Sequence, residues 1–486
     1  MIRSFALAAS AAAALLAAPL AGPAGAQTPP DRDWAAVTRT DVEAAYALLN
    51  DNHPGALPEI GDTDFRQRLE DGRALALERA TRVSDAGGHR AVMNGFAGAM
   101  GDRHIAFQPA GPASWSWAGV VFRKAGAEWR VSAHEPDPGE ADLVDAVLVD
   151  CDGAAADATA RAWLDGFQLD WSVEAQRERR GALLLLDNGN PFLRRPATCR
   201  FETDGGTVER AMRWREITPQ TLQPMLNAAY RGRRAGMGVR SFAGGDWIAL
   251  QSLGDGASAV VESVRAEAAR LRASPVVVLD LRGNGGGASM LGLQIAEALM
   301  GPAFVQARTA GKGTCGAVWR ASDGNLAALR AWRATAAERG PEFAAWLEGS
   351  IAGIERANAA GAPTDAPVTD CDPSPAPAGP GPASLMQGRL VLITDESCFS
   401  SCLIVTDDFR RLGALHLGHA TDRATRYMEV RAEPLPSGLG EFSTLQKMAL
   451  GEMATGPFPP DIVHEGPMHD DAALEAWVMA ALTSRR

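Results

Sequence analysis

The sequence predicts a multidomain α+β protein, and three successive patterns along the chain support this fold class. Apolar residues recur at helical spacing within residues 27–110, and short runs rich in β-branched and aromatic residues fill residues 111–240. Residues 241–486 alternate strand-like and helix-like segments, as α/β domains do. With 486 residues, the chain is long enough for roughly two to four domains.

The first 26 residues have the features of a cleaved secretory signal peptide. Arg3 supplies a positive charge, residues 5–20 are almost all Ala and Leu, and residues 24–26 (Ala-Gly-Ala) fit a cleavage site. A membrane anchor is the alternative, but the apolar run is short and contains Pro19. We expect cleavage near Ala26 and a periplasmic or secreted protein.

The charge balance argues against two classes of partner. The net charge is −12 and no long basic run occurs, so neither nucleic acid nor an anionic membrane is expected as the main partner. Beyond the signal, no stretch reaches about 18 uncharged apolar residues, and we expect no integral membrane segment in the mature chain. These patterns leave the oligomeric state open.

The six cysteines are an even number, which is typical of disulfide-bonded exported proteins. Zinc sites built from cysteines need clustered pairs, and only Cys398 and Cys402 lie close together. Proximity along the chain favours the pairs Cys151–Cys199, Cys315–Cys371 and Cys398–Cys402.

Spacing also predicts the elements of the first two regions. Helical runs cover residues 42–49 and 65–80, with a turn at 52–55 between them. The β-rich region contains a hairpin turn at residues 204–206. Its four candidate strands cover residues 120–122, 129–131, 146–149 and 199–201.

Two continuous apolar runs mark the third region. Residues 275–280 and 389–393 are typical of strands buried on both faces of a sheet. Between them, residues 320–357 have helical character and residues 361–383 are rich in proline. We therefore expect one α/β domain that carries a Pro-rich insertion at about 311–385.

A glycine loop follows the first of these strands. Residues 280–287 (Asp-Leu-Arg-Gly-Asn-Gly-Gly-Gly) lie between the strand and an expected helix. Such backbone can present N–H groups to an oxyanion or to a dinucleotide, and it can also be a structural turn. A dinucleotide site would need an acidic residue at the end of the next strand, and residues 304–308 offer none.

A serine motif follows the second strand, and a histidine lies far upstream of it. Residues 398–402 (Cys-Phe-Ser-Ser-Cys) occupy an expected helix N-terminus, where a serine is either a nucleophile aided by the helix dipole or an N-cap. His104 follows the helical run 93–100 and is a candidate general base, although a lone histidine is more often structural and the chain has eight.

Together these segments resemble the tail-specific (C-terminal-processing) serine peptidases and their tricorn-core relatives. The glycine loop, the serine motif and residues 102–104 (Asp-Arg-His) are similar to the histidine-using branch of that family. The resemblance implies a helical N-terminal domain at 27–110, a β-rich, PDZ-like module at 111–240 and a crotonase-like α/β peptidase domain at 241–486. It also implies an active site at the interface of the first and third regions.

Carried over to this chain, the family's serine motif implies Ser400 as the nucleophile, with Ser397 and Ser401 as fallbacks. The resemblance further implies that the oxyanion is bound by the backbone N–H groups of Ser401 and of Gly285 or Gly286.

The base role falls to His104, because the lysine that the processing branch uses about 25 residues after the serine is replaced here by Thr425. The histidine branch also uses a carboxylate shortly before a Pro-Asp marker, which residues 460–463 (Pro-Asp-Ile-Val) resemble. Glu452 is the candidate nearest that place, and Glu429 is the runner-up. An alternative role for Asp102 is to orient the loop instead of the imidazole.

The implied function is that of an exported serine peptidase, which hydrolyses polypeptides through an acyl-enzyme on Ser400 with His104 as general base. This chemistry needs neither a metal nor an organic cofactor. Two alternatives stay open: a catalytically inactive relative that binds a peptide or another ligand in the periplasm, and a hydrolase of small esters or amides.

Overall fold

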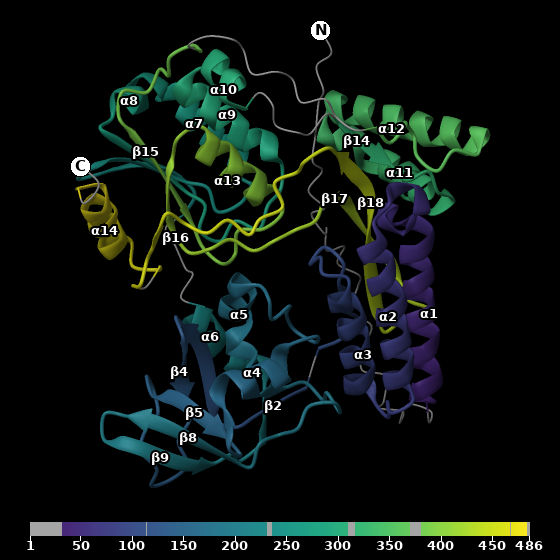
Figure 1. Cartoon of the computed structure of the whole chain (residues 1–486), viewed down its shortest axis with the longest axis vertical. Coiled ribbons are helices and arrows are strands. Elements are labelled where there is room, and N and C mark those ends of the chain that lie inside the picture. The colour runs from purple at the N-terminus through teal and green to yellow at the C-terminus, as the bar shows by residue number, and fades with distance from the viewer. Residues whose placement is uncertain are drawn as a thin grey trace, which may run out of the picture.

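The structure, a computed structural model, is an α+β multidomain protein with several sheets (Figure 1). It describes residues 32–112, 114–230, 236–309, 316–369, 381–466 and 468–483. The predicted signal peptide and the predicted pair Cys315–Cys371 lie outside the described residues. Within them, no helix combines the length and the apolar character needed to cross a membrane.

Three N-terminal helices pack side by side against a four-stranded antiparallel sheet (Figure 1). Their shared core includes Phe96, whose ring stacks on that of Phe442 with centroids 5.7 Å apart. The helices therefore share one core with strands from the C-terminal part of the chain. The elements are α1 (Trp34–Asn52), α2 (Thr63–Ala80), α3 (Ala86–Ala99), β1 (Phe107–Pro109), β14 (Gly316–Trp319), β17 (Tyr427–Pro434) and β18 (Gly440–Leu450).

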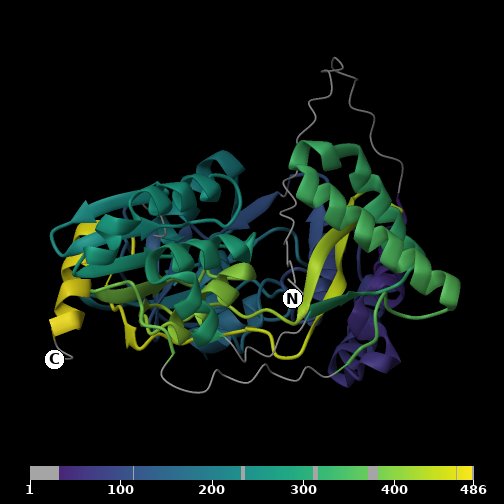
Figure 2. The same cartoon turned by 90° about the horizontal axis from the view of Figure 1, so that it is seen from above.

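A helical hairpin extends from this sheet and lies within the predicted insertion. It consists of α11 (Asp323–Ala336) and α12 (Pro341–Ala360), which pack on each other through buried apolar side chains (Figure 2). Trp319 of β14 belongs to the same cluster, so the hairpin is anchored to the sheet and not to the α/β layers.

The β-rich region forms an antiparallel sheet in the order β3-β4-β5-β8-β9, with β6 paired to β5, and a small sheet β10-β2-β7. The predicted disulfide Cys151–Cys199 is confirmed and joins β5 to β8. The strands are β2 (Trp115–Trp117), β3 (Val120–Ala125), β4 (Glu128–His134), β5 (Val147–Cys151), β6 (Ala154–Ala155), β7 (Leu186–Asp187), β8 (Thr198–Thr203), β9 (Gly206–Ala211) and β10 (Arg215–Ile217). The helices are α4 (Ala156–Leu164), α5 (Glu174–Arg180) and α6 (Pro219–Tyr230).

The third region is a three-layer α/β unit around a six-stranded sheet. Its order is β11-β12-β13-β15-β16-β19, and all neighbours are parallel except β11 and β12. The strands are β11 (Gly238–Phe242), β12 (Gly245–Ala249), β13 (Val276–Asp280), β15 (Arg389–Thr394), β16 (Leu415–Gly418) and β19 (Ile462–Val463).

Helices cover both faces of this sheet, because alternate residues of its strands point to opposite sides. Val277 and Leu279 pack with α7 (Ala257–Ala266), α9 (Ser289–Met300) and α13 (Ser401–Arg411). Val276 and Val278 pack with α14 (Asp471–Thr483). Two further helices, α8 (Ala268–Ala273) and α10 (Pro302–Thr309), lie beside α9.

The central strands β13 and β15 are direct parallel neighbours, with Asp280 opposite Ile393. Parallel neighbours end at the same edge of a sheet, so the glycine loop after β13 and the serine motif after β15 lie next to each other.

Candidate active site

Ser400 occupies a strained turn between β15 and α13. Its backbone angles are φ 59° and ψ −128°, which non-glycine residues seldom adopt and which cost energy unless the surroundings impose them. Ser400 stands at the N-cap position of α13, yet its side chain makes no capping hydrogen bond. The hydroxyl is therefore available for another partner.

Contacts from both strand ends hold this turn. The Asp395 carboxylate accepts hydrogen bonds from the backbone N–H groups of Gly283 and Ser397, at 2.9 and 3.0 Å. The predicted disulfide Cys398–Cys402 is confirmed and closes the turn around Ser400. Together these contacts supply the surroundings that such a backbone conformation requires.

The hydroxyl of Ser400 meets His104, which lies almost 300 positions earlier in the chain. The distance from Ser400 Oγ to His104 Nε2 is 2.9 Å, and His104 Nδ1 lies 2.7 Å from Asp102 Oδ1. A carboxylate only accepts hydrogen bonds, so Nδ1 carries the imidazole hydrogen and Nε2 turns its lone pair to the serine. This is the arrangement in which a histidine can remove the serine proton.

Asp102 is buried and ionised, and it holds both the ring and the backbone of His104. Its Oδ1 also accepts from the backbone N–H of His104 at 2.9 Å, and its Oδ2 accepts from the hydroxyl of Thr425. Burial alone would raise the pKa of this carboxyl, but the charge of His104 and these hydrogen bonds lower the pKa to about 2. Asp102 thus orients the loop and the imidazole together.

The Phe399 side chain is packed between the two residues that follow Asp102. Its ring centroid is 4.5 Å from that of His104, and the Arg103 guanidinium lies 4.5 Å from it. Arg103 is also paired with Asp422, whose carboxylate accepts from Gln176 of α5 at 2.9 Å. The β-rich region therefore contacts the network that positions the histidine.

The backbone N–H groups expected to bind an oxyanion differ in their surroundings. Ser401 begins α13, where the first N–H groups have no acceptor within the helix. Gly285 is exposed, whereas the N–H of Gly286 donates to Asn284 Oδ1 at 2.9 Å. Of the expected donors, Ser401 and Gly285 therefore have the less committed N–H groups.

The hydroxyl of the fallback residue Ser401 has a structural partner. It donates to the backbone carbonyl of Gly287 at 2.6 Å, which ties the start of α13 to the glycine loop. The other fallback, Ser397, uses its backbone N–H in the turn described above. The hydrogen bond to His104 is made by Ser400.

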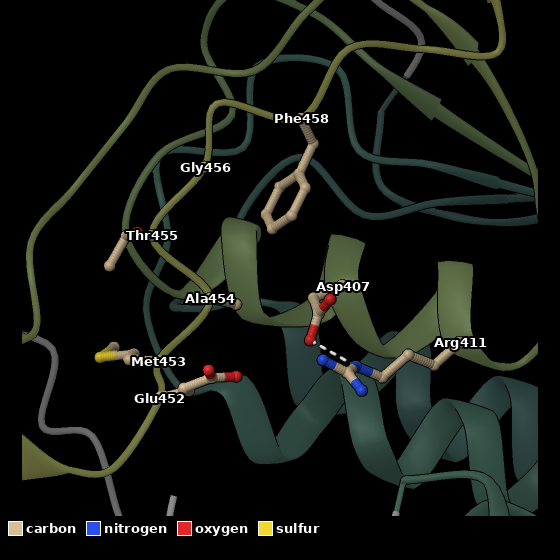
Figure 3. Close-up of a pocket in the computed structure, with 8 residues that line it drawn as sticks. All are labelled: Asp407, Arg411, Glu452, Met453, Ala454, Thr455, Gly456 and Phe458. Atoms are coloured by element: carbon tan, nitrogen blue, oxygen red, sulfur yellow. Dashed lines mark hydrogen bonds and ion pairs between the residues drawn. The ribbon is translucent and has the colours of Figure 1, made fainter. Parts of the chain in front are cut away.

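The two other candidate carboxylates lie elsewhere. Glu452 lines a pocket of about 240 Å³ together with Asp407 and Arg411, near the C-terminal end of α13 (Figure 3). At 1.5 Å per residue, these helix positions are about 9 and 15 Å along the axis from Ser401. Glu429 is buried in β17, where burial raises its pKa to about 7 despite the charge of Lys447. The carboxylate beside His104 is that of Asp102.

Sequence reasoning therefore missed two partners. From the sequence, Asp102 was assigned to orienting the loop and not the imidazole ring of His104. Its position two residues before His104 was a usable signal for the contact with the ring. Thr425, considered only as the site of an absent lysine, supports the carboxylate through its hydroxyl. No local pattern around Thr425 predicts that contact.

No family model matches the chain, and no curated protein matches its sequence. Solved structures share its fold. Mature CPAF complexed with lactacystin superposes with a TM-score of 0.57 at 12% identity, over 88% of this chain and 94% of that chain. Mature CPAF alone gives 0.53 at 13% identity, over 88% and 92%. A serine-to-alanine mutant of CPAF gives 0.55 at 13% identity, over 90% and 94%. The chain therefore shares the overall fold of CPAF.

Proposed function

We propose that this protein is an exported serine peptidase that cleaves polypeptides through an acyl-enzyme on Ser400. The observation that carries the proposal is the continuous chain of hydrogen bonds from Ser400 through His104 to Asp102. A purely structural serine at a helix N-terminus would cap the helix, whereas this hydroxyl is directed to an imidazole nitrogen.

In the first step His104 Nε2 accepts the proton of the Ser400 hydroxyl as Oγ attacks the peptide carbonyl. Asp102 holds the hydrogen on Nδ1 and stabilises the imidazolium that forms. The N–H groups of Ser401 and Gly285 stabilise the oxyanion of the tetrahedral intermediate. The imidazolium then protonates the leaving amine, and a water activated by the same nitrogen releases the acid product.

Two observations support the family and the fold proposed for this activity. The similarity to CPAF covers most of both chains, although it is a similarity of fold. The glycine loop and the serine motif adjoin at the edge of a parallel sheet, as expected of the crotonase-like domain of a tail-specific peptidase. The base is a histidine, in keeping with the histidine-using branch. The β-rich region lies at the position in the chain where the family carries its PDZ-like module.

Export is supported by the disulfides. Cys151–Cys199 and Cys398–Cys402 both form in the described part of the chain, and such bonds persist in oxidising compartments. With the signal-like first 26 residues, they favour the periplasm or the extracellular space.

The test is labelling of the purified mature protein with a fluorophosphonate probe, comparing wild type with Ser400→Ala and His104→Ala. Ser397→Ala is the matched control, since it removes a hydroxyl from the same turn. We expect the wild type and the control to label, and labelling to be lost in the other two variants. Labelling that survives Ser400→Ala would assign the nucleophile elsewhere. An unlabelled but folded wild type would favour the non-catalytic binding protein.

A further inference from the structure

A second histidine is surrounded by oxygen atoms outside the Ser400 site. His419 follows β16, Glu178 belongs to α5 of the β-rich region, and Glu396 lies in the turn between β15 and α13. Each of the three side chains offers one ligand atom, and these atoms all lie within 4.8 Å of one another. We call these residues the His419 cluster.

The orientation of the His419 ring is set by a backbone carbonyl. Its Nε2 lies 2.9 Å from the carbonyl oxygen of His464, and because a carbonyl only accepts, Nε2 carries a hydrogen. The other nitrogen, Nδ1, is buried and has no hydrogen-bond partner among the described residues. Metal-binding histidines are commonly held in this way, with one N–H bound to a carbonyl and the other nitrogen directed to the ion.

The distances from Nδ1 to the two carboxylates match the separation between ligand atoms around a metal ion. Oε2 of Glu178 lies 3.4 Å away and Oε2 of Glu396 lies 3.6 Å away, both longer than an ordinary hydrogen bond. Around a tetrahedral Zn²⁺ with ligand bonds of about 2.0–2.2 Å, neighbouring ligand atoms are roughly 3.3–3.6 Å apart. One imidazole and two carboxylates, with water as the fourth ligand, make a set that zinc accepts.

We infer that Glu178, Glu396 and His419 bind a divalent transition-metal ion, with Zn²⁺ as the best fit. Each of the three side chains is about one fifth exposed or less, at 20%, 14% and 22%, so the site is shielded but can be reached from solvent. The residues come from three separate parts of the sequence, which is why no metal was expected from the cysteine and histidine spacing.

The two carboxylates also favour a positive charge at this position. Burial alone would lower the pKa of His419, but the carboxylates of Glu178 and Glu396 raise it to about 11. An ion coordinates through the lone pair of Nδ1, so it binds the ring in the form that carries its hydrogen on Nε2.

The ion would join the β-rich region to the turn that carries the nucleophile. Glu396 precedes Ser400 by four residues, and α5 already reaches the peptidase region through Gln176 and Asp422. A bound ion adds a second link between α5 and this turn.

The experiment uses the full mature protein in the Ser400→Ala form, stripped with EDTA and titrated with ZnCl₂ by calorimetry. In this form binding is measured without any peptidase activity, so the test does not depend on the proposed function. We expect one saturable site per chain and a rise in Tm. Co²⁺ should give the visible absorption of a tetrahedral site.

Glu178→Gln and His419→Ala should each weaken Zn²⁺ binding at least tenfold. Glu174→Gln is the matched control, because it removes the same charge from an exposed position on the same helix and should bind as tightly as the parent. Circular dichroism of the EDTA-treated variants establishes that they are folded. Absence of a saturable site, or binding that survives both substitutions, would overturn the inference and leave His419 as an imidazolium paired with two carboxylates.

Discussion

His104 and His419 have opposite hydrogen-bonding environments. At His104, Nδ1 is bound to one carboxylate and Nε2 faces a hydroxyl at 2.9 Å. At His419, Nε2 is bound to a carbonyl and Nδ1 faces two carboxylates at 3.4 and 3.6 Å. The first arrangement can accept a proton from a neutral donor, whereas the second attracts a cation.

The chemistry of each histidine is therefore set by its partners and not by its place in the sequence. Both rings lie near the turn after β15, since His104 contacts Ser400 and His419 contacts Glu396. A hydroxyl opposite the free nitrogen favours nucleophilic catalysis, and a pair of carboxylates favours a proton or a metal ion. Substitutions at Asp102, Gly286 and Thr425 test the arrangement around His104, and one at His53 tests a buried histidine in a different environment.

The largest effect is expected at the carboxylate of the His104 region. Asp102→Asn should slow fluorophosphonate labelling about 10³–10⁴-fold, because an amide can donate to Nδ1 and favour the wrong tautomer. Glu452→Gln should change the labelling rate less than about twofold, since Glu452 lines the pocket at the other end of α13. A large loss in Glu452→Gln with a small one in Asp102→Asn would restore Glu452 as the third residue.

The next effect tests the close approach of the glycine loop to Ser400. A Cβ on Gly286 would lie 2.8 Å from Ser400 Cβ, and its φ of 106° is unfavourable for alanine. Gly286→Ala should displace the serine and slow labelling about 10²-fold. Gly285→Ala meets no atom within 4 Å and keeps its N–H, so it should label at nearly the parent rate. Equal rates for the two variants would contradict this placement of Ser400.

A smaller effect is expected at Thr425, whose hydroxyl donates to Asp102. Thr425→Val keeps the shape and removes this donor, so the pKa of Asp102 should rise and labelling should slow roughly fivefold. Thr425→Ser, which retains the hydroxyl, is the control. If valine and serine behave alike, the hydroxyl has no role in orienting His104.

The last prediction concerns stability and a third histidine. His53 is fully buried, its Nδ1 accepts from the Gly55 N–H at 3.0 Å, and its Nε2 has no partner among the described residues. Burial, partly offset by the charge of Asp102, lowers the pKa of His53 from 6.5 to about 3. Unlike His419, it forms no ion pair with a carboxylate of the described residues.

The lowered pKa of His53 determines how stability changes with pH. Between pH 6.5 and 3 the unfolded chain binds a proton at His53 that the native chain does not, so stability is lost as pH falls through this range. The loss is on the order of 5 kcal/mol. In His53→Asn the amide oxygen can still accept from the Gly55 N–H, but the stacking on Phe65 is lost. The variant should therefore be less stable at pH 7, and its free energy of unfolding should change less with pH. Urea unfolding at several pH values measures both, and parallel curves for the two proteins would refute the prediction.

Much of the fold could be predicted because its signals are local. The apolar runs at 275–280 and 389–393 became the buried strands β13 and β15, and the hairpin turn at 204–206 connects β8 to β9. The pairs Cys151–Cys199 and Cys398–Cys402 were also predicted. The meeting of Ser400 with His104 was expected from the family resemblance, and spacing alone could not supply it.

The positions of strands, turns and helix starts follow from the amino-acid sequence alone, since apolar periodicity and turn-forming glycine or serine residues act over a few residues. The sequence also limited the candidate nucleophiles to one short motif. The packing of distant segments is needed to bring Ser400 to His104, Thr425 to Asp102, and Glu178 to Glu396 and His419. These contacts join residues through the packing of separate elements, and their distances in space bear no fixed relation to their spacing in the chain.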